Sequence, residues 1–380
     1  MIYRFDAIDT FFFRSSLPFD IGAENSVECI FPPLPSVYTG ALRSCTLKNY
    51  SDRHDLNKKL KVGLNGIMMN GEPLFPVPRD LNMKSESDRK FAYPSFEKND
   101  ISSYPLEFLY CESEMKKENI IPEGAYIKKV DLMRYLNVKN LNCEMISKEK
   151  LFKTEYRTGV QIENTERTAE DKKLYTITQI HPNDDVSVYA QTQGISVSDG
   201  TIVKFGGESK SAIINSMEDS LDMDIRLDDN EKFFKLYLAT PAIFKNGWIP
   251  WWIKNDMTGI FKYKNKSVKI KLLCASIGRY TPVGGFGTYW DEKEKCLKSY
   301  PKKMHYAVPA GSVYYFSIEE GKPEDVLKLF HKKCISDYRE HCPNGFKYEN
   351  WGKLRYCDRG FGYSLVGKLT DEQKNDLEKK

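Results

Sequence analysis

The sequence predicts an α+β chain made of two ferredoxin-like (RRM-like) units, each a βαββαβ succession of strands and helices. Two observations support this prediction. A strand, a helix and a hairpin follow one another in the first third of the chain, and a comparable order of elements follows an acidic stretch that ends at Glu231. The 380 residues suffice for two domains with separate cores. We place an N-terminal domain with insertions and a protruding hairpin at residues 1–222, and a C-terminal domain at 223–380.

The first unit is expected to start with a strand, because residues 1–13 are aromatic and β-branched. The prolines of Phe31 to Pro35 interrupt the chain, and Ser36 is placed to cap a helix over residues 37–50. Asn70-Gly71 joins two apolar runs, which is typical of a tight hairpin turn. The further strands of this unit are expected at residues 63–69, 73–77, 174–180, 186–191 and 201–205.

Residues from about 80 to 170 are polar and lysine-rich, and we interpret them as insertions with one short helix at 130–136. The stretch from Glu208 to Glu231 has 8 acidic and 2 basic side chains and is the best candidate for a linker. The second unit is expected to contain a strand at 233–239, a turn and short helix at 241–254, strands at 268–277 and 312–318, a helix at 324–338 and a strand at 363–369.

Total charge gives little indication of a nucleic-acid binder, because 57 basic residues face 53 acidic ones. The local distribution is more informative. Phe261 to Lys303 holds 11 basic and 3 acidic side chains, so this stretch is where a phosphate backbone could be neutralised. A solvated, lysine-rich face is the alternative. The 13% of aromatic residues mostly indicate core packing, with a minority available to stack on bases.

The nine cysteines are odd in number and contain no C-x-x-C pair, which favours reduced thiols over a disulfide framework. Arg4, Asp6 and Asp9 interrupt the first apolar stretch, so no signal peptide is expected. No apolar run reaches the 18 residues or so of a membrane helix. We therefore expect a soluble, cytoplasmic protein with no membrane partner.

The search for catalytic motifs finds no G-x-S-x-G, no P-loop and no H-E-x-x-H. We expect no catalytic residue, no cofactor and no metal. The histidines at 54, 181 and 305 lack an evident partner nucleophile. Buried thiols are favoured over zinc for the one group of possible ligands, which is His331, Cys334, His341, Cys342 and Cys357.

Two glycine-rich segments are candidates for phosphate or RNA contact. In Asp358–Gly367, Gly360 and Gly362 allow close backbone approach beside Arg359, just before the strand at Tyr363; a tight turn without a ligand is the alternative. In Tyr280–Gly287, Arg279 precedes Gly284, Gly285 and Phe286; here a β-bulge or hairpin tip is the alternative.

A third candidate is a protruding hairpin that precedes the strand at Leu174. It has Arg157 and Arg167 near its expected tip. Such a hairpin could wedge into a nucleic-acid duplex, or it could dock a neighbouring subunit.

Several segments together resemble a known superfamily. They are Phe31–Ser36 leading into Tyr38–Arg43, the region from Arg157 to Tyr175, Val308–Ser312, and Gly360–Ser364. This pattern is similar to the RAMP superfamily of CRISPR-associated proteins. Within it, the match is to the third subunits of type III-B (Cmr) effector complexes, and it extends from Phe5 to about Gly367.

The resemblance implies two ferredoxin-like domains and a subunit that binds the repeat-derived 5′ handle of the guide RNA (crRNA). It implies contacts with the large polymerase-like subunit and with the backbone RAMP subunits. It also implies that the protruding hairpin acts as a thumb on the guide–target duplex near the handle. The positions to which it assigns RNA contact are Ser36, Thr39, Arg43, Arg157, Arg167, Gly284 to Phe286, and Gly360 to Tyr363.

Three functions therefore remain open from the sequence. The first is a non-catalytic subunit that binds the crRNA handle. The second is a metal-independent endoribonuclease that processes precursor crRNA through a histidine or lysine. The third is a scaffold that contacts protein only.

Overall fold

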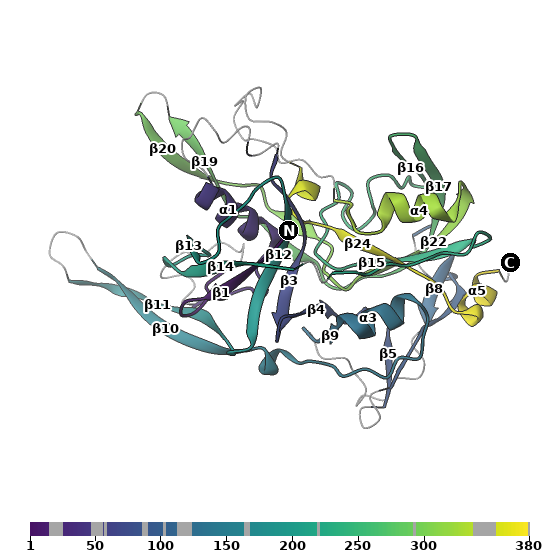
Figure 1. The fold of residues 1–380 in the computed structure, drawn as a ribbon, viewed down its shortest axis with the longest axis horizontal. Helices are drawn as coiled ribbons and strands as arrows, with labels where there is room; N and C mark the ends of the chain where they lie inside the picture. The colour runs from purple at the N-terminus through teal and green to yellow at the C-terminus, as the bar shows by residue number, and fades with distance from the viewer. Residues whose placement is uncertain are drawn as a thin grey trace.

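The computed structural model describes residues 1–14, 26–46, 56, 59–85, 90–101, 104–111, 124–162, 168–218, 221–291, 294–336 and 355–378. Within these ranges the chain is α+β and rich in strands, as the sequence predicts (Figure 1). Two large antiparallel sheets form its body, and two long hairpins project from one end. In the parts of the chain that the structure describes, no helix is long and apolar enough to cross a membrane.

The first sheet is built around β1. Its strands, in spatial order, are β13 (Thr201–Lys204), β14 (Ser211–Met217), β1 (Ile2–Ala7), β12 (Val186–Gln193), β3 (Lys61–Met69), β4 (Glu72–Pro76) and β9 (Tyr126–Lys128). Helix α1 (Pro35–Thr46) covers one face, where Tyr38 and Leu42 pack with Phe5 and Phe205. The turn between β3 and β4 has positive φ at both Asn70 and Gly71, so the predicted hairpin is confirmed.

The second sheet is built around β15. Its strands, in spatial order, are β16 (Thr258–Tyr263), β17 (Lys266–Ser276), β22 (Val313–Glu320), β15 (Phe233–Leu238), β24 (Tyr363–Gly367) and β23 (Lys333–Cys334). Helix α4 (Pro323–Phe330) packs against one face through Val326, Leu329 and Phe330.

Strand β15 explains how the two sheets share a core. All six of its residues are buried, and successive side chains point to opposite faces. Phe234 and Leu236 enter the cluster under α4. Phe233 and Tyr237 enter a second cluster, which also contains Ile2 and Leu64 of the first sheet. Apart from Lys235 the strand is apolar, which is what burial on both faces favours.

The remaining elements are short or peripheral. They are β2 (Ser26–Val27), β5 (Asn82–Ser85), β6 (Lys90–Ala92), β7 (Ser95–Lys98), β8 (Phe108–Cys111), α3 (Lys129–Leu136), η3 (Lys148–Lys150), β10 (Phe152–Ile162), β11 (Ala169–Pro182), β18 (Thr281–Val283), β19 (Phe286–Asp291), β20 (Cys296–Pro301), β21 (His305–Ala307), η5 (Tyr356–Asp358) and α5 (Asp371–Glu378). The two projecting hairpins are β10–β11 and β19–β20 (Figure 1).

The acidic stretch proposed as a linker is packed against the body. Leu221, Met223 and Ile225 are buried in the shared core, while Asp222 and Asp224 alternate with them and are exposed. Both exposed carboxylates reach the Lys332 ammonium, at 3.6 and 2.5 Å. The stretch is therefore no free linker: Ser211–Met217 forms β14 of the first sheet, and residues 221–225, which we call the strap, are docked on the shared core.

Several predicted elements are wrong. Residues 241–254 form turns and isolated bridges with no helix, and the helix expected at 324–338 ends at Phe330. The chain between β12 and β14 also lacks a helix, although every residue from 194 to 210 is described. Strands β14 and β16 were not predicted. Residues 241–254 are instead a partly buried loop, which places Trp252 against Phe330 at 5.5 Å.

Candidate nucleic-acid interface

The glycine-rich segment before β24 is a buried joint between the two sheets. Gly360 and Gly362 have φ of +89° and +74°, the left-handed region that favours glycine. A Cβ on Gly360 would lie 2.5 Å from Asn65 Nδ2, and one on Gly362 would lie 2.9 Å from the Ser336 nitrogen. These glycines are therefore required for close packing inside the protein.

The polar backbone groups of this joint have partners within the chain. Gly360 O accepts hydrogen bonds from Thr240 Oγ1 at 2.8 Å and from Asn65 Nδ2 at 3.2 Å. The Gly362 N–H donates to Pro241 O at 2.7 Å, and the Tyr363 N–H donates to Thr240 Oγ1 at 2.8 Å. A phosphate would have to displace these bonds. RNA contact by Gly360, Gly362 and Tyr363 stays a prediction, and the geometry gives them a packing role.

Arg359 and the predicted contacts on α1 are also largely inside the fold. Arg359 is 5% exposed and lies over the Tyr356 ring at 5.6 Å. Thr39 is buried, and its hydroxyl has no hydrogen-bond partner among the described residues. Ser36 and Arg43 are half-buried. RNA contact by these four residues stays a prediction.

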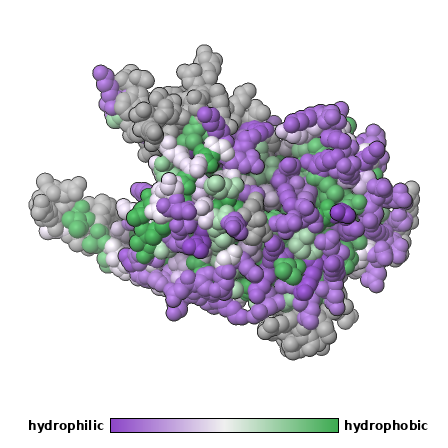
Figure 2. All heavy atoms as spheres, viewed as in Figure 1, coloured by the Kyte–Doolittle hydropathy of each residue, from purple (hydrophilic) through white to green (hydrophobic). Residues whose placement is uncertain are grey.

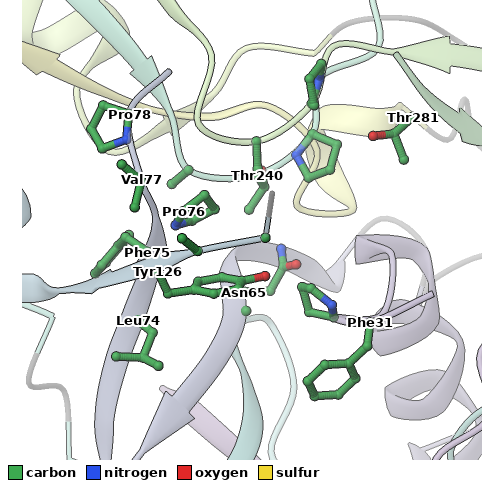
Figure 3. A pocket seen from close by; sticks show the side chains of 18 of the residues that line it. Phe31, Asn65, Leu74, Phe75, Pro76, Val77, Pro78, Tyr126, Thr240 and Thr281 are labelled. Carbon is green, nitrogen blue, oxygen red and sulfur yellow. The ribbon is translucent and has the colours of Figure 1, made fainter. Parts of the chain in front are cut away.

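Beside the buried joint lies a cavity of about 520 Å³. Its wall combines the Phe31–Leu34 segment, the β3–β4 hairpin, Thr240 and the Pro309–Ala310 turn (Figure 3). Two of the segments that resemble the superfamily, Phe31–Ser36 and Val308–Ser312, are far apart in sequence. The fold brings them together at this cavity. The volume lies within the range of roughly 300–1,000 Å³ that is usual for small-molecule sites.

Arg79 stands at the edge of this cavity and was not predicted from the sequence. Its side chain is exposed, and its Nε donates to Ala310 O at 3.4 Å. The backbone N–H of Arg79 donates to Gly311 O at 2.9 Å, and its carbonyl accepts from Ser276 Oγ at 2.9 Å. Both sheets thus position this residue. The only sequence signal is a charged pair, Arg79-Asp80, directly after a buried strand.

Exposed aromatic rings gather at the base of the β19–β20 hairpin. Tyr280 and Tyr306 are 55% and 59% exposed, and their ring centroids lie 4.5 Å apart. Phe286 is 65% exposed, and Arg279 is exposed as well. We call Arg279, Tyr280, Phe286 and Tyr306 the aromatic rim. The sequence pointed to three of these residues but missed Tyr306, because only the pairing of β18 with β21 sets it beside Tyr280.

The predicted glycine loop at this rim is open. Gly285 has a φ of +124°, and a Cβ built on it would meet no atom within 4 Å. Gly284 is half-buried and Gly285 is exposed. The space beside the Gly285 Cα is therefore open to a ligand, which is not the case around Gly362, although the Gly285 carbonyl accepts a hydrogen bond from the Lys302 N–H at 2.8 Å.

The basic stretch from Phe261 to Lys303 does not form one surface. Its first part lies on the β16–β17 hairpin and its last part on β19–β20, which stand apart in Figure 1. Several of its lysines are ion-paired within the fold: Lys266 with Asp325, Lys269 with Glu320, Lys271 with Glu107, and Lys298 with Asp291 and Glu294. The excess of basic over acidic residues in this stretch therefore overestimates how much positive charge is available to bind a phosphate backbone.

The β10–β11 hairpin has an exposed apolar face. Tyr156, Val160 and Leu174 are 71%, 38% and 59% exposed, and Val160 pairs directly with Leu174. Figure 2 shows hydrophobic residues along this projecting arm. Arg157 lies midway along the hairpin opposite Ile177, so its expected place near the tip is wrong. Arg167 lies outside the described residues.

Arg157 is held by carboxylates at the base of the arm. Its Nε donates to Glu155 at 2.7 Å, and its Nη2 lies 3.6 Å from Asp9. Asp9 also accepts a hydrogen bond from Lys210 at 2.7 Å, and this bond is the main cause that lowers the pKa of the Asp9 carboxyl. The guanidinium therefore has protein partners in this structure.

In the described parts of the chain, no group of three or more histidine, cysteine, aspartate or glutamate side chains is arranged to hold a metal ion. His54, His341 and Cys342 lie outside those parts. His305 is 8% exposed and packs against the Tyr356 ring at 5.5 Å. His331 is tied to the Met223 carbonyl at 2.7 Å, and burial raises the pKa of the Cys334 thiol.

Comparison with known families decides where this chain belongs. The model of the CRISPR-associated protein (Cas_Cmr3) family matches residues 3–367. The chain belongs to the Cas_Cmr3 family. The resemblance indicated by the segments at Phe31, Val308 and Gly360 is thus confirmed. No curated protein matches the sequence.

Solved structures similar to this Cas_Cmr3 member share little sequence with it. A chain of the type III-B Cmr-beta complex bound to cognate target RNA is 16% identical, with 95% of each chain covered and a TM-score of 0.47. A chain of the same complex with target RNA and AMPPnP is 16% identical, covering 83% of this chain and 86% of that one, with a TM-score of 0.45. A chain of the Csm3–Csm4 subcomplex of type III-A is 11% identical, with coverages of 84% and 94% and a TM-score of 0.32.

Proposed function

We propose that this protein is a non-catalytic subunit of a type III-B Cmr effector complex that binds the 5′ handle of the crRNA. Membership of the Cas_Cmr3 family over residues 3–367 is the observation that carries the proposal. Its partners are then the large polymerase-like subunit, the backbone RAMP subunits and target RNA near the handle. The exposed apolar face of β10–β11 suits a thumb that meets the guide–target duplex.

We further propose that each large sheet is a modified ferredoxin-like unit. The order β14-β1-β12-β3 and the order β24-β15-β22-β17 both have the first strand of the unit between its fourth and third. A βαββαβ unit has this order. The first unit keeps its first helix, α1, and the second unit keeps its second helix, α4. In each case a loop or strand replaces the missing helix.

The aromatic rim is the part of the surface that we assign to the RNA. Single-stranded bases stack on exposed aromatic side chains, and arginine adds contact to the phosphate backbone. Tyr280 and Tyr306 expose more than half of their surface beside Arg279. An open glycine backbone at Gly285 adjoins them.

The test replaces Tyr280 and Tyr306 with alanine in the assembled complex and measures crRNA retention. Because stacking contributes about 1–3 kcal/mol per base, handle affinity should fall about tenfold or more. Tyr263→Ala is the matched control, since Tyr263 is 62% exposed on β16, away from the rim. Equal affinity of the double variant and the control would remove the rim from the interface.

The absence of catalysis is tested separately. Purified protein incubated with repeat RNA and no metal should leave the RNA intact. Among the described histidines, His305 is buried, which is unfavourable for a general acid or base that must reach RNA. A defined cut that disappears in His305→Ala would establish the endoribonuclease instead.

A further inference from the structure

The cavity beside the buried joint has the chemistry of a binding site. Most of its lining residues are apolar, and Phe31 and Tyr126 add aromatic rings (Figure 3). Asn65 and Asn82 are the amide side chains among the lining residues, and Asn65 Nδ2 already donates to the Gly63 and Gly360 carbonyls. A ligand that fits this wall has a flat, partly apolar body with hydrogen-bonding edges.

The charges of the wall narrow the ligand further. Arg79 is the one charged residue among those that line the cavity, all of which the structure describes, and no carboxylate is among them. Its guanidinium is at the exposed edge, held by the Ala310 carbonyl at 3.4 Å. A guanidinium at the mouth of an uncharged pocket favours a ligand whose negative charge stays outside.

Two wall residues also contain buried polar atoms that lack partners. Tyr189 is 1% exposed and Asn82 is 4% exposed. Among the described residues, neither Tyr189 Oη nor Asn82 Nδ2 has a hydrogen-bond partner. Both atoms are inaccessible from the cavity, so they lie behind its wall, and a ligand would bond to them only after a side chain moved.

We propose that this cavity binds a single nucleotide, with the base between the aromatic and proline walls and the phosphate at Arg79. A nucleobase is flat, has acceptors on its edges and is joined to an anionic phosphate. The nucleotide belongs either to the bound RNA, as an unstacked residue, or to the free pool. The first source rests on the proposed function, because it requires the chain to hold RNA.

Three arms test this proposal with the full-length chain. The first uses a series of repeat-derived RNAs, each lacking one base. Removal of one particular base should weaken binding roughly tenfold, because its stacking is lost. The same series is measured with Ala310→Trp, which fills the mouth from a half-exposed position. The dependence on that base should then disappear, whereas Ala310→Ser should keep it.

The second arm titrates AMP, GMP, CMP and UMP while thermal unfolding is followed. Saturable stabilisation that Ala310→Trp abolishes would identify the free nucleotide as the source. In the third arm, Arg79→Ala should weaken whichever nucleotide binds, and Lys262→Ala, an exposed residue on β16, should not. Arg79 is exposed, so this variant is expected to fold.

The outcomes separate the cavity from the function. If wild-type protein binds RNA but no abasic position matters and no monophosphate binds, the cavity proposal is wrong and the proposed function stands. If wild-type protein binds no RNA, either alone or in the assembled complex, the proposed function fails, and the monophosphate arm alone decides whether the cavity holds a nucleotide.

Discussion

The two glycine-rich segments look alike in sequence and have opposite places in the structure. Gly360 and Gly362 are packed against Asn65 and Ser336, with their backbone groups bonded inside the chain. Gly285 has an equally unusual φ but open space around it. A positive φ shows only that glycine is required; whether it serves packing or a ligand depends on what the fold places opposite.

The same substitution in the two segments should therefore have different effects. Gly362→Asp strains the backbone and buries a carboxylate, so we expect it to lower the free energy of unfolding by about 4 kcal/mol or more. Gly285→Asp meets no neighbouring atom and should cost about 1–2 kcal/mol while weakening RNA binding through charge repulsion. Denaturant unfolding of both variants is the measurement. If the two variants lost the same free energy of unfolding, the two segments would not differ in how tightly they are packed.

The far end of the buried segment is tied to an unusual lysine. A Cβ on Gly367 would lie 2.9 Å from Lys235 Cε, and the Lys235 ammonium lies 3.4 Å from the Tyr135 ring centroid. Desolvation by burial is the main cause that lowers the pKa of Lys235, to about 7, while the Asp80 carboxylate acts in the opposite direction. The lysine is therefore a titrating group inside the shared core.

Lys235 makes the stability of this core depend on pH. Its pKa is about 7 in the folded protein and about 10.4 in the unfolded chain, so the unfolded chain binds more protons between these values. The free energy of unfolding should rise from pH 7 to 10, by up to about 1.4 kcal/mol per unit. In Lys235→Met that contribution should vanish. If the free energy of unfolding varied with pH in the same way for both proteins, the Lys235 ammonium would be solvated rather than buried.

His331 gives a weaker dependence in the acid range. The Val366 N–H donates to its Nδ1 at 3.2 Å, so Nε2 carries the proton and donates to the Met223 carbonyl of the strap at 2.7 Å. Burial is the main cause that lowers the pKa of this histidine.

Stability should consequently be lost as pH falls below about 6.5, the usual histidine pKa, because the unfolded chain then binds the extra proton. We expect the free energy of unfolding to be lower at pH 5 than at pH 7. Thermal unfolding of wild type and His331→Gln at pH 5 and 7 measures it. A His331→Gln profile as steep as that of wild type would assign the loss to other groups.

The smallest expected effect compares the two arginines. Arg279 is exposed beside the open loop, and Arg359 is 5% exposed beside the buried one. Arg279→Ala should reduce the salt dependence of RNA affinity by about one phosphate contact, a slope change of about 0.7 for a single strand. Arg359→Ala should change stability and leave that slope unchanged. If Arg359→Ala reduced the salt slope and Arg279→Ala left it unchanged, RNA would contact the buried segment and not the rim, which contradicts the proposed interface.

The sequence predicts strands and hairpins well where local chemistry dictates them. The turn at Asn70-Gly71 requires positive φ at both residues, and the strand from Phe233 to Leu238, apolar except for Lys235, favours burial on both faces. For Pro241 to Lys254 the sequence predicts a turn and a short helix, and the structure has turns and isolated bridges. Trp252 of this loop packs against Phe330 of α4 at 5.5 Å, a contact that only the tertiary structure sets.

The candidate site was predictable only in part for the same reason. Tyr280 and Phe286 stand out beside glycines, whereas Tyr306 and Arg79 carry no local signal and gain their places through strand pairing and backbone contacts across the sheets. The sequence also does not show which backbone groups are accessible to a ligand. Nothing in the sequence of Gly360 to Tyr363 shows that its backbone is already bonded to Thr240 and Pro241.

Crosslinking in the assembled complex, with ultraviolet light and mass spectrometry of the peptides, tests the central claim most directly. The claim is that RNA lies on the open rim and that the buried glycine segment supports the fold. We predict nucleotide adducts on Tyr280, Phe286 or Tyr306 and none on Phe361 or Tyr363. Adducts on Tyr363, with none on the rim, would contradict it.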